Sequence, residues 1–243
     1  MSLAAARGPG WGLLYDARLV HDPGPGFIAS LWDRSPSGLA ERGRTRVVFV
    51  EAPGGQWALR HYRRGGLYGR LVPDLYAWRG AERTRCWREL RMLARLCELG
   101  LPVPRPVAAA WRRQALWYRA DLVTVRIPGA RPLSSRLGAG EEVDWAGIGA
   151  MVWRFHDAGA HHADLNAHNI MLDQDGAPWL LDFDKARFRP PGSWRDDNLA
   201  RLQRSLRKIA GEPGAPAFDA AGWEALRTGY AEARRLGLRA SGP

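Results

Sequence analysis

Cysteine and lysine are scarce in this chain. Its 243 residues include 2 cysteines, and the only lysines are Lys185 and Lys208. Cys86 and Cys97 fall in one predicted helix, about 16 Å apart along its axis, so they cannot bond to each other. The sequence therefore argues against a disulfide-rich secreted scaffold and favours a reducing compartment.

Long apolar runs are absent as well. No run approaches the roughly 18 residues that a membrane-spanning helix needs. The first residues, MSLAAARGPGWGLL, have no sustained apolar stretch after the basic residue, so we expect no signal peptide. With 46% hydrophobic and 25% charged residues, the composition is typical of a soluble globular protein with one sizeable domain or two smaller lobes.

Acidic residues are under-represented in one region. Residues 41–120 contain 17 Arg and 6 acidic residues, and they carry the net charge of +11, whereas the rest of the chain is balanced. A general preference for Arg would explain the kind of cation but not its location. We therefore expect an anionic partner, either a nucleic acid, a phosphorylated lipid or a membrane surface.

The distribution of apolar and turn residues predicts an α+β protein. Strands are expected at 46–50 and 56–62, joined as a hairpin by APGG, with further strand residues within 115–127. An amphipathic helix is expected from Glu82 to Leu99, and Gly100 ends it. Further helices are predicted at 144–158, 194–209 and 220–236.

This order of elements predicts two lobes. The Pro- and Gly-rich stretch 128–140 marks the boundary between them. We therefore divide the chain into an N-terminal extension, 1–37, a β-rich N-lobe with one main helix, 38–127, and a mostly helical C-lobe, 128–243.

The stretch HHADLNAHNIMLD, residues 161–173, concentrates histidine, aspartate and asparagine before a second hairpin. Asp175-Gly176 predicts a two-residue turn, and in that register Asn169 lies directly opposite Asp182. Amide and carboxylate oxygens suit Mg²⁺, so these two residues are predicted metal ligands. Asp164 stands five residues before Asn169 and can accept a proton from a hydroxyl that attacks a metal-held phosphate.

This spacing is that of the protein-kinase pattern H-R-D-x-x-x-x-N…D-F-G, which here reads His162-Ala163-Asp164, Asn169 and Asp182-Phe183-Asp184. A kinase also needs a cation on an N-lobe strand and a helical Glu to hold it. The tetrapeptide WALR, 57–60, stands where kinases have V-A-I-K. We therefore predict that Arg60 binds the nucleotide and pairs with Glu89; the alternative is an Arg that contacts a phosphate or lies at the surface.

The stretches RHYRRGG, YRADL, HADLNAHNI and LLDFDKAR together resemble the lipopolysaccharide kinase family of 3-deoxy-D-manno-octulosonic acid (Kdo) kinases, over roughly residues 38–210. The resemblance implies a two-lobed, protein-kinase-like fold and phosphorylation of the Kdo 4-hydroxyl on a lipid A precursor, with ATP and Mg²⁺. It assigns catalysis to Asp164 and metal binding to Asn169 and Asp182. It also implies peripheral attachment to the cytoplasmic face of the bacterial inner membrane, with a lipid-linked sugar as partner and no nucleic acid.

Other interpretations stay open at this point. A metal-dependent hydrolase or oxygenase would use His156, His161, His162 and Asp164 as ligands. A basic RNA-binding module or a pseudokinase would keep the charge without the chemistry. Within the kinase class, the runner-up is an enzyme of the same fold that acts on a heptose or an aminoglycoside-like molecule, and the basic N-lobe favours the lipid-linked substrate. The sequence does not indicate the oligomeric state.

The tract 61–85 mixes arginine with tyrosine, leucine and tryptophan. It is either an ordinary exposed surface or a surface that meets anionic lipid head groups. On the second interpretation, the docking cations are Arg63, Arg64 and Arg70.

Overall fold

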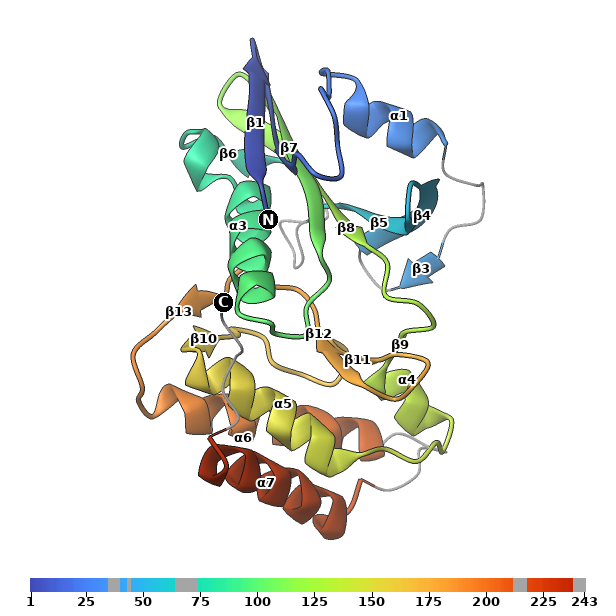
Figure 1. The fold of residues 1–243 in the computed structure, drawn as a ribbon, viewed down its shortest axis with the longest axis vertical. Coiled ribbons are helices and arrows are strands. Elements are labelled where there is room, and N and C mark those ends of the chain that lie inside the picture. Colours follow the sequence, from blue (N-terminus) through green and yellow to red (C-terminus); the bar gives the residue numbers. More distant parts are fainter. Residues whose placement is uncertain (35–39, 43–44, 64–73, 212–217, 238–243) are drawn as a thin grey trace. The chain divides into compact units, whose positions relative to one another are not determined.

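The computed structural model describes residues 1–34, 40–42, 45–63, 74–211 and 218–237. The chain divides into two compact units. The first comprises Met1–Ala94 and Arg105–Arg126, and the second comprises Arg95–Pro104 and Ile127–Pro243. The change after Arg126 falls next to the predicted end of the N-lobe at residue 127. Figure 1 shows the strands of the first unit and the helices of the second.

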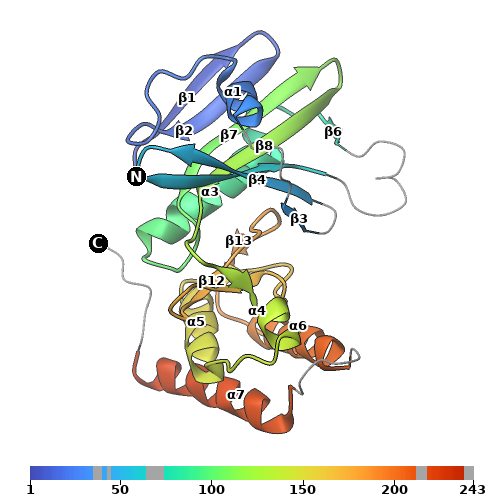
Figure 2. The ribbon, with the colours of Figure 1, turned by 90° about the vertical axis from the view of Figure 1, so that its right-hand side faces the viewer.

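The first unit is built on an eight-stranded antiparallel sheet (Figure 2). Its order is β1-β2-β7-β8-β5-β4-β3, and β6 pairs with β8. The bounds are β1 Leu3–Gly8, β2 Trp11–Asp16, β3 Ala40–Arg42, β4 Thr45–Ala52, β5 Gly55–His61, β6 Tyr76–Ala77, β7 Pro106–Gln114 and β8 Trp117–Val125. The predicted hairpin of β4 and β5 is confirmed.

The region predicted as an N-terminal extension, 1–37, belongs to the first unit in its described part, 1–34, contrary to the prediction. β1 and β2 belong to the sheet because β2 pairs with β7 along its length. The buried carboxylate of Asp16 anchors this region, since it accepts hydrogen bonds from the Ser2 and Arg18 amides and from Arg105, the last at 2.8 Å. β1 and β7 are rich in alanine, which has low strand propensity, so the sequence pattern did not predict them.

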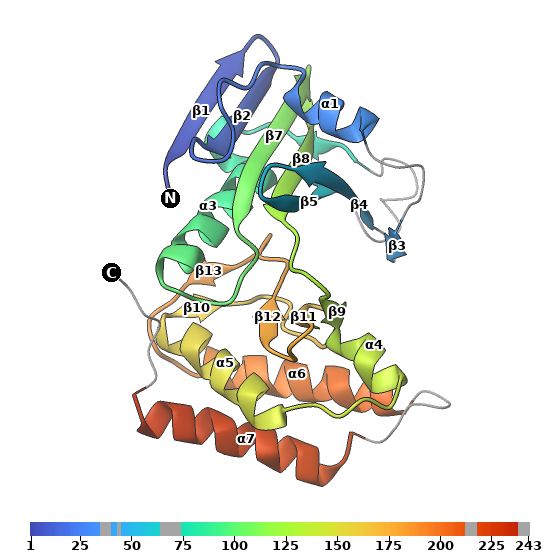
Figure 3. The same ribbon diagram turned by 45° about the vertical axis from the view of Figure 1, so that its right-hand side comes forward.

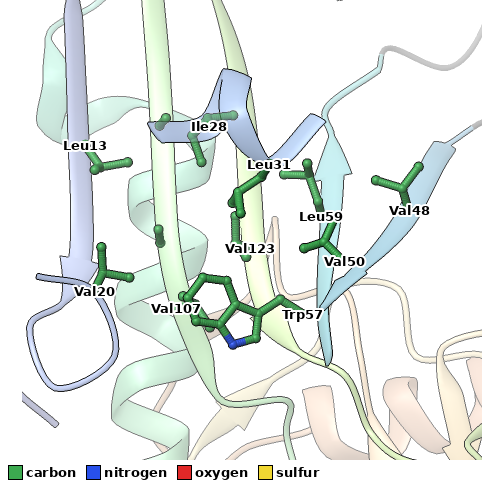
Figure 4. Close-up of a cluster of buried hydrophobic side chains, with 12 residues drawn as sticks. Leu13, Val20, Ile28, Leu31, Val48, Val50, Trp57, Leu59, Val107 and Val123 are labelled. Carbon is green, nitrogen blue, oxygen red and sulfur yellow. The ribbon is translucent and has the colours of Figure 1, made fainter. Parts of the chain in front are cut away.

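A short helix, α1 (Phe27–Asp33), covers one face of this sheet (Figure 4). Ile28 and Leu31 of this helix contact buried side chains of the strands. The cluster consists of Leu13, Val20, Ile28, Leu31, Val48, Val50, Trp57, Leu59, Val107, Ala108, Ala110 and Val123. Burial of this apolar surface is the main contribution to the stability of the unit.

The main helix, α3 (Arg85–Glu98), lies behind the strands in Figure 4. It begins three residues later than predicted, because Thr84 is extended, with a ψ of 143°, and separates it from the 3-10 turn Ala81–Arg83. Its cysteines, Cys86 and Cys97, form no disulfide. The helix buries a stripe of side chains that includes Trp87, Leu90, Leu93 and Ala94.

The second unit is mostly helical (Figure 3). Three of its helices confirm the predicted positions to within a residue or two: α5 (Trp145–Asp157), α6 (Trp194–Ala210) and α7 (Ala220–Arg235). The remaining elements are β9 Arg131–Pro132, α4 Leu133–Gly138, β10 Ala160–His161, β11 Ile170–Leu172, β12 Pro178–Leu180 and β13 Arg187–Phe188.

Two glycines allow α5 and α7 to approach closely. A Cβ at Gly149 would overlap the backbone of Leu226, and one at Gly229 would overlap that of Ala146. Figure 3 shows α7 running along α5. Among the described residues, no helix is both long enough and apolar enough to cross a bilayer.

Candidate active site

The hairpin of β11 and β12 carries the predicted metal ligands at its open end. Ile170 pairs with Leu180, and the Leu181 amide donates to the Asn169 carbonyl at 2.9 Å. Asn169 therefore lies opposite Leu181, not opposite Asp182, and the predicted register was wrong by one residue.

The cause of this shift is the length of the turn. The Asp173 amide donates to the Ala177 carbonyl at 3.1 Å, so three residues and not two form the loop. Gly176 has a φ of +80°, in the left-handed region that such a three-residue loop needs. The Asp173 carboxylate also accepts from the amides of Asp175 and Ala177, which favours the longer turn.

Asp182 has an unusual backbone conformation. Its φ is +66°, a left-handed value that a residue other than glycine rarely adopts. Such strain persists only where the surroundings impose it, and it is common at functional sites. Because Asp182 directly follows Leu181, it leaves the hairpin at the end where Asn169 enters it.

The loop that enters the hairpin is organised around the backbone carbonyl of Asp164. This oxygen accepts hydrogen bonds from the side-chain amides of Asn166 and Asn169, each at 2.9 Å. The bond orients the Asn169 amide with its nitrogen toward Asp164 and its oxygen on the opposite side. Asn169 can therefore offer an oxygen to a cation.

His162 joins this loop to the residue before Asp182. The imidazole is 2% exposed, its Nε2 donates to the Leu181 carbonyl at 2.9 Å, and its Nδ1 accepts from the Asp164 amide at 3.2 Å. An amide can only donate, so Nδ1 carries no proton and the ring is neutral. Burial lowers the pKa of His162, against the opposing effect of its bond to Leu181.

Two further contacts hold the His162 segment in place. The ring meets Phe183 edge-on, with centroids 4.9 Å apart, and Phe183 in turn stacks on Phe155 of α5. The side-chain amide of Asn198, on α6, donates to the His162 carbonyl at 3.1 Å. The motif residues are therefore fixed to two helices of the second unit.

The carboxylate of Asp164 is accessible, with a side-chain exposure of 51%. Arg201 of α6 contacts it, and the distance from Nε to Oδ1 is 3.1 Å. Burial alone would raise the pKa of Asp164, but the Arg201 guanidinium outweighs this effect and holds the pKa below its usual range. The sequence did not predict the role of Arg201, because several arginines line the exposed side of α6 and their spacing does not distinguish one from another.

Arg60 and Glu89 form the predicted pair in the first unit. Successive side chains of β5 point to opposite faces, so Arg60 points away from the cluster that contains Leu59 and toward α3. Arg60 Nη2 lies 2.5 Å from Glu89 Oε2, and the Tyr62 hydroxyl also donates to this oxygen. Glu89 is 2% exposed. Burial of the Tyr62 hydroxyl, together with the Glu89 carboxylate, raises the pKa of Tyr62 well above its usual value.

The geometry does not support the metal-hydrolase interpretation. His156 is buried with its Nδ1 3.0 Å from the Tyr230 hydroxyl, and burial lowers its pKa to about 3. Both nitrogens of His162 are used in hydrogen bonds. Within the described residues, no three histidine, cysteine or acidic side chains are grouped as a metal site.

Comparison with known proteins agrees with this geometry. The family described as "Lipopolysaccharide kinase (Kdo/WaaP) family" matches residues 30–230. The chain belongs to this family. It is therefore a kinase, a phosphotransferase, as predicted.

Individual relatives extend over most of the chain. The 3-deoxy-D-manno-octulosonic acid kinase of Stenotrophomonas maltophilia (strain K279a) is 45% identical over 203 residues, which are 82% of either chain. That of Xylella fastidiosa (strain 9a5c) is 43% identical over 221 residues, 90% of this chain and 88% of the relative. The solved structure of WaaP in complex with acyl carrier protein has a TM-score of 0.58 at 18% identity, and covers 92% of this chain and 91% of its own. The protein-kinase-like α+β fold is confirmed.

Loss of the Arg60 cation should destabilise the protein. We expect Arg60→Met to lower the free energy of unfolding in urea by about 3 kcal/mol, because Glu89 is left as a buried carboxylate without this cation. The double variant Arg60→Met/Glu89→Leu should recover most of the loss, since the buried charge is gone.

Arg63→Met is the matched control, because Arg63 is exposed and its loss changes the charge equally. We expect it to stay within about 0.5 kcal/mol of the wild type. If Arg60→Met were as stable as this control, Arg60 would not neutralise Glu89.

Proposed function

We propose that this kinase transfers the γ-phosphoryl group of ATP to the 4-hydroxyl of a Kdo residue on a lipid A precursor of the Kdo–lipid IVA type, in lipopolysaccharide core biosynthesis. The names of the relatives support Kdo as the acceptor. The observation that carries the chemistry is the double hydrogen bond of His162, which ties Asp164 to the residue before Asp182.

Asp164 is the base in this proposal. An aspartate carboxylate is ionised at neutral pH, and Arg201 lowers the pKa of this one further. The carboxylate is also accessible to an acceptor. Its oxygen takes the proton of the 4-hydroxyl as the hydroxyl oxygen bonds to the γ-phosphorus and the bond to the β–γ bridging oxygen breaks. ADP leaves with that oxygen.

Asn169 and Asp182 would hold Mg²⁺. One amide oxygen and one carboxylate fit a hard cation that keeps its other positions for water and phosphate oxygens. The orientation of the Asn169 amide supports this assignment, because its nitrogen is already bonded to the Asp164 carbonyl. When bound, the ion would neutralise charge on the phosphates of ATP.

Arg60 would supply the nucleotide-binding cation. Glu89 and Tyr62 hold its guanidinium side, as a helical glutamate holds the strand cation of kinases. Arg60 is 20% exposed, so part of its side chain stays accessible to the phosphates of ATP.

We further propose that the protein attaches peripherally to an anionic membrane, the cytoplasmic face of the bacterial inner membrane. Of the predicted docking cations, Arg63 is exposed, whereas Arg64 and Arg70 lie outside the described residues. A described feature supports the proposal: Leu116 (74% exposed), in the turn between β7 and β8, and Trp117 (44% exposed), the first residue of β8, lie side by side in the chain at this turn.

Cations flank this turn. Arg112, Arg113 and Arg119 are exposed, and no acidic residue occurs between positions 106 and 120. Arg119 pairs with Asp74 at 2.7 Å and Arg112 lies 3.8 Å from Asp121, so Arg113 is the one of the three without a salt bridge to a described residue. Tryptophan and leucine beside arginine are suited to the boundary between lipid head groups and acyl chains. The turn thus combines apolar insertion with attraction to anionic lipid.

Removing the two apolar side chains should weaken membrane binding. We expect Leu116→Ser/Trp117→Thr to lower binding to vesicles containing anionic phospholipid by about a hundredfold, at roughly 1.5 kcal/mol for each side chain. Vesicle cosedimentation measures this, and Leu236→Ser, at an exposed leucine of the other unit, is the control. Unchanged vesicle binding by the double variant would remove the turn from the docking surface, and a dimer lost in this variant would assign it to self-association.

The proposed reaction is tested with purified protein, Mg-ATP and Kdo–lipid IVA, with the product identified by mass and the phosphate position by NMR. We expect one phosphate on the Kdo 4-hydroxyl, and no product from a heptose or an aminoglycoside.

Asp164→Asn should lower turnover by about 10²–10⁴-fold with ATP binding retained. Asp182→Ala should abolish the Mg²⁺-dependent increase in melting temperature with ATP, and Asn169→Ala should reduce it less.

Two results would contradict these assignments. Turnover by Asp164→Asn within about threefold of the wild type would exclude Asp164 as the base. A full Mg-ATP shift in Asp182→Ala would exclude this carboxylate as the principal metal ligand.

A further inference from the structure

The contact between Arg201 and Asp164 needs an explanation beyond the transfer of a proton. Both Nε and Nη2 of Arg201 donate to the same oxygen, Oδ1, of the proposed base. A cation that donates to this oxygen makes it a weaker proton acceptor. Taken alone, the contact therefore opposes the function of Asp164.

The remaining donors of Arg201 indicate what else it can bind. A guanidinium has five N–H donors in a planar fork, and Oδ1 of Asp164 takes only two of them. The side chain is 47% exposed, so part of its donor edge is accessible to a ligand that has reached Asp164. Carboxylates and phosphates match the geometry of this fork.

We propose that Arg201 binds the carboxylate of the sugar acid on which the kinase acts, an inference that rests on the proposed function. The reacting hydroxyl must lie within about 3 Å of Asp164. The Arg201 guanidinium contacts Asp164, so the other substituents of the same sugar ring lie no farther from Arg201 than about the width of that ring. A Kdo residue carries such a substituent, its carboxylate, whereas a neutral sugar does not.

Binding of this carboxylate also resolves the opposition between Arg201 and the base. The acceptor carboxylate binds donors that Oδ1 leaves unused and places a second negative charge beside the guanidinium. This charge offsets the effect of Arg201 on Asp164, so Oδ1 becomes a better acceptor for the hydroxyl proton. Arg201 therefore links recognition of an acidic sugar to activation of its hydroxyl, whereas a neutral sugar brings no such charge.

The test pairs two enzymes with two acceptors. Wild type and Arg201→Gln are each assayed with Kdo–lipid IVA and with the same acceptor after reduction of the Kdo carboxylate to an alcohol. We expect the wild type to favour the acid in kcat/KM by about ten- to a hundredfold, as for loss of a hydrogen bond to a charged group. In Arg201→Gln this preference should fall to about threefold or less, and Arg201→Lys, which keeps the charge, should retain part of it.

Arg207→Gln is the matched control. Arg207 is exposed on the same helix, and six residues place it about 240° around the axis from Arg201. This variant should keep the full preference for the acid. Melting temperatures of all variants identify any loss of folding.

The outcomes distinguish failure of carboxylate recognition by Arg201 from failure of the proposed Kdo kinase reaction. If Arg201→Gln slows both acceptors by the same factor, Arg201 acts only on Asp164 or on the transferred phosphoryl group, and the inference is wrong while the function stands. If the wild type prefers neither acceptor, carboxylate recognition is likewise excluded. If the wild type phosphorylates neither acceptor, the proposed function fails, and the inference with it.

Discussion

One buried, neutral imidazole determines the geometry of the second unit's motif residues. His162 donates from Nε2 to the Leu181 carbonyl and accepts at Nδ1 from the Asp164 amide, so it connects two segments 17 residues apart in the chain. Protonation of the ring would remove the acceptor, and burial, which lowers the pKa of His162, opposes this protonation. These two hydrogen bonds, the His162 clamp, restrain the backbone next to Asp182, which directly follows Leu181 and has the left-handed conformation.

The first unit contains a buried carboxylate, Glu89, which is likewise stabilised by hydrogen bonds from two side chains. Glu89 is buried, and a lone carboxylate there would be costly. Arg60 and the Tyr62 hydroxyl both reach its Oε2, and the Arg60 guanidinium also lies over the Tyr62 ring, 4.8 Å from its centroid. In this chain an arginine therefore occupies the strand position that kinases give to lysine, and its planar group uses the aromatic neighbour as well as the acid.

Local sequence patterns predicted much of this arrangement, because the relevant signals are short-range. The helices at α5 and α7 follow capping residues, Asp144 and Asp219, whose side chains accept from Gly147 and Gly222 in the structure. The spacing of Asp164, Asn169 and Asp182 is equally local. The pairing of Arg60 with Glu89 followed from the kinase pattern, in which a strand cation pairs with a helical glutamate.

The features that were missed depend on tertiary contacts. The segments β1 and β7 are alanine-rich, and they form strands because both pair with β2 in the sheet. The hairpin register depended on the Asp173 side chain, which selects a three-residue loop over the two-residue loop that Asp175-Gly176 indicated. Arg201 reaches Asp164 from 37 residues away, and only the packing of α6 distinguishes it from the other arginines of that helix.

The most direct test of the His162 clamp is the turnover of His162→Phe. Phenylalanine keeps a ring against Phe183 but can make neither hydrogen bond. If the clamp positions Asp164 and Asp182, turnover should fall by at least about a hundredfold, and the Mg²⁺-dependent shift in melting temperature with ATP should shrink, while the protein without ligand still unfolds cooperatively. A folded His162→Phe variant with wild-type turnover would contradict the claim that this imidazole organises the site.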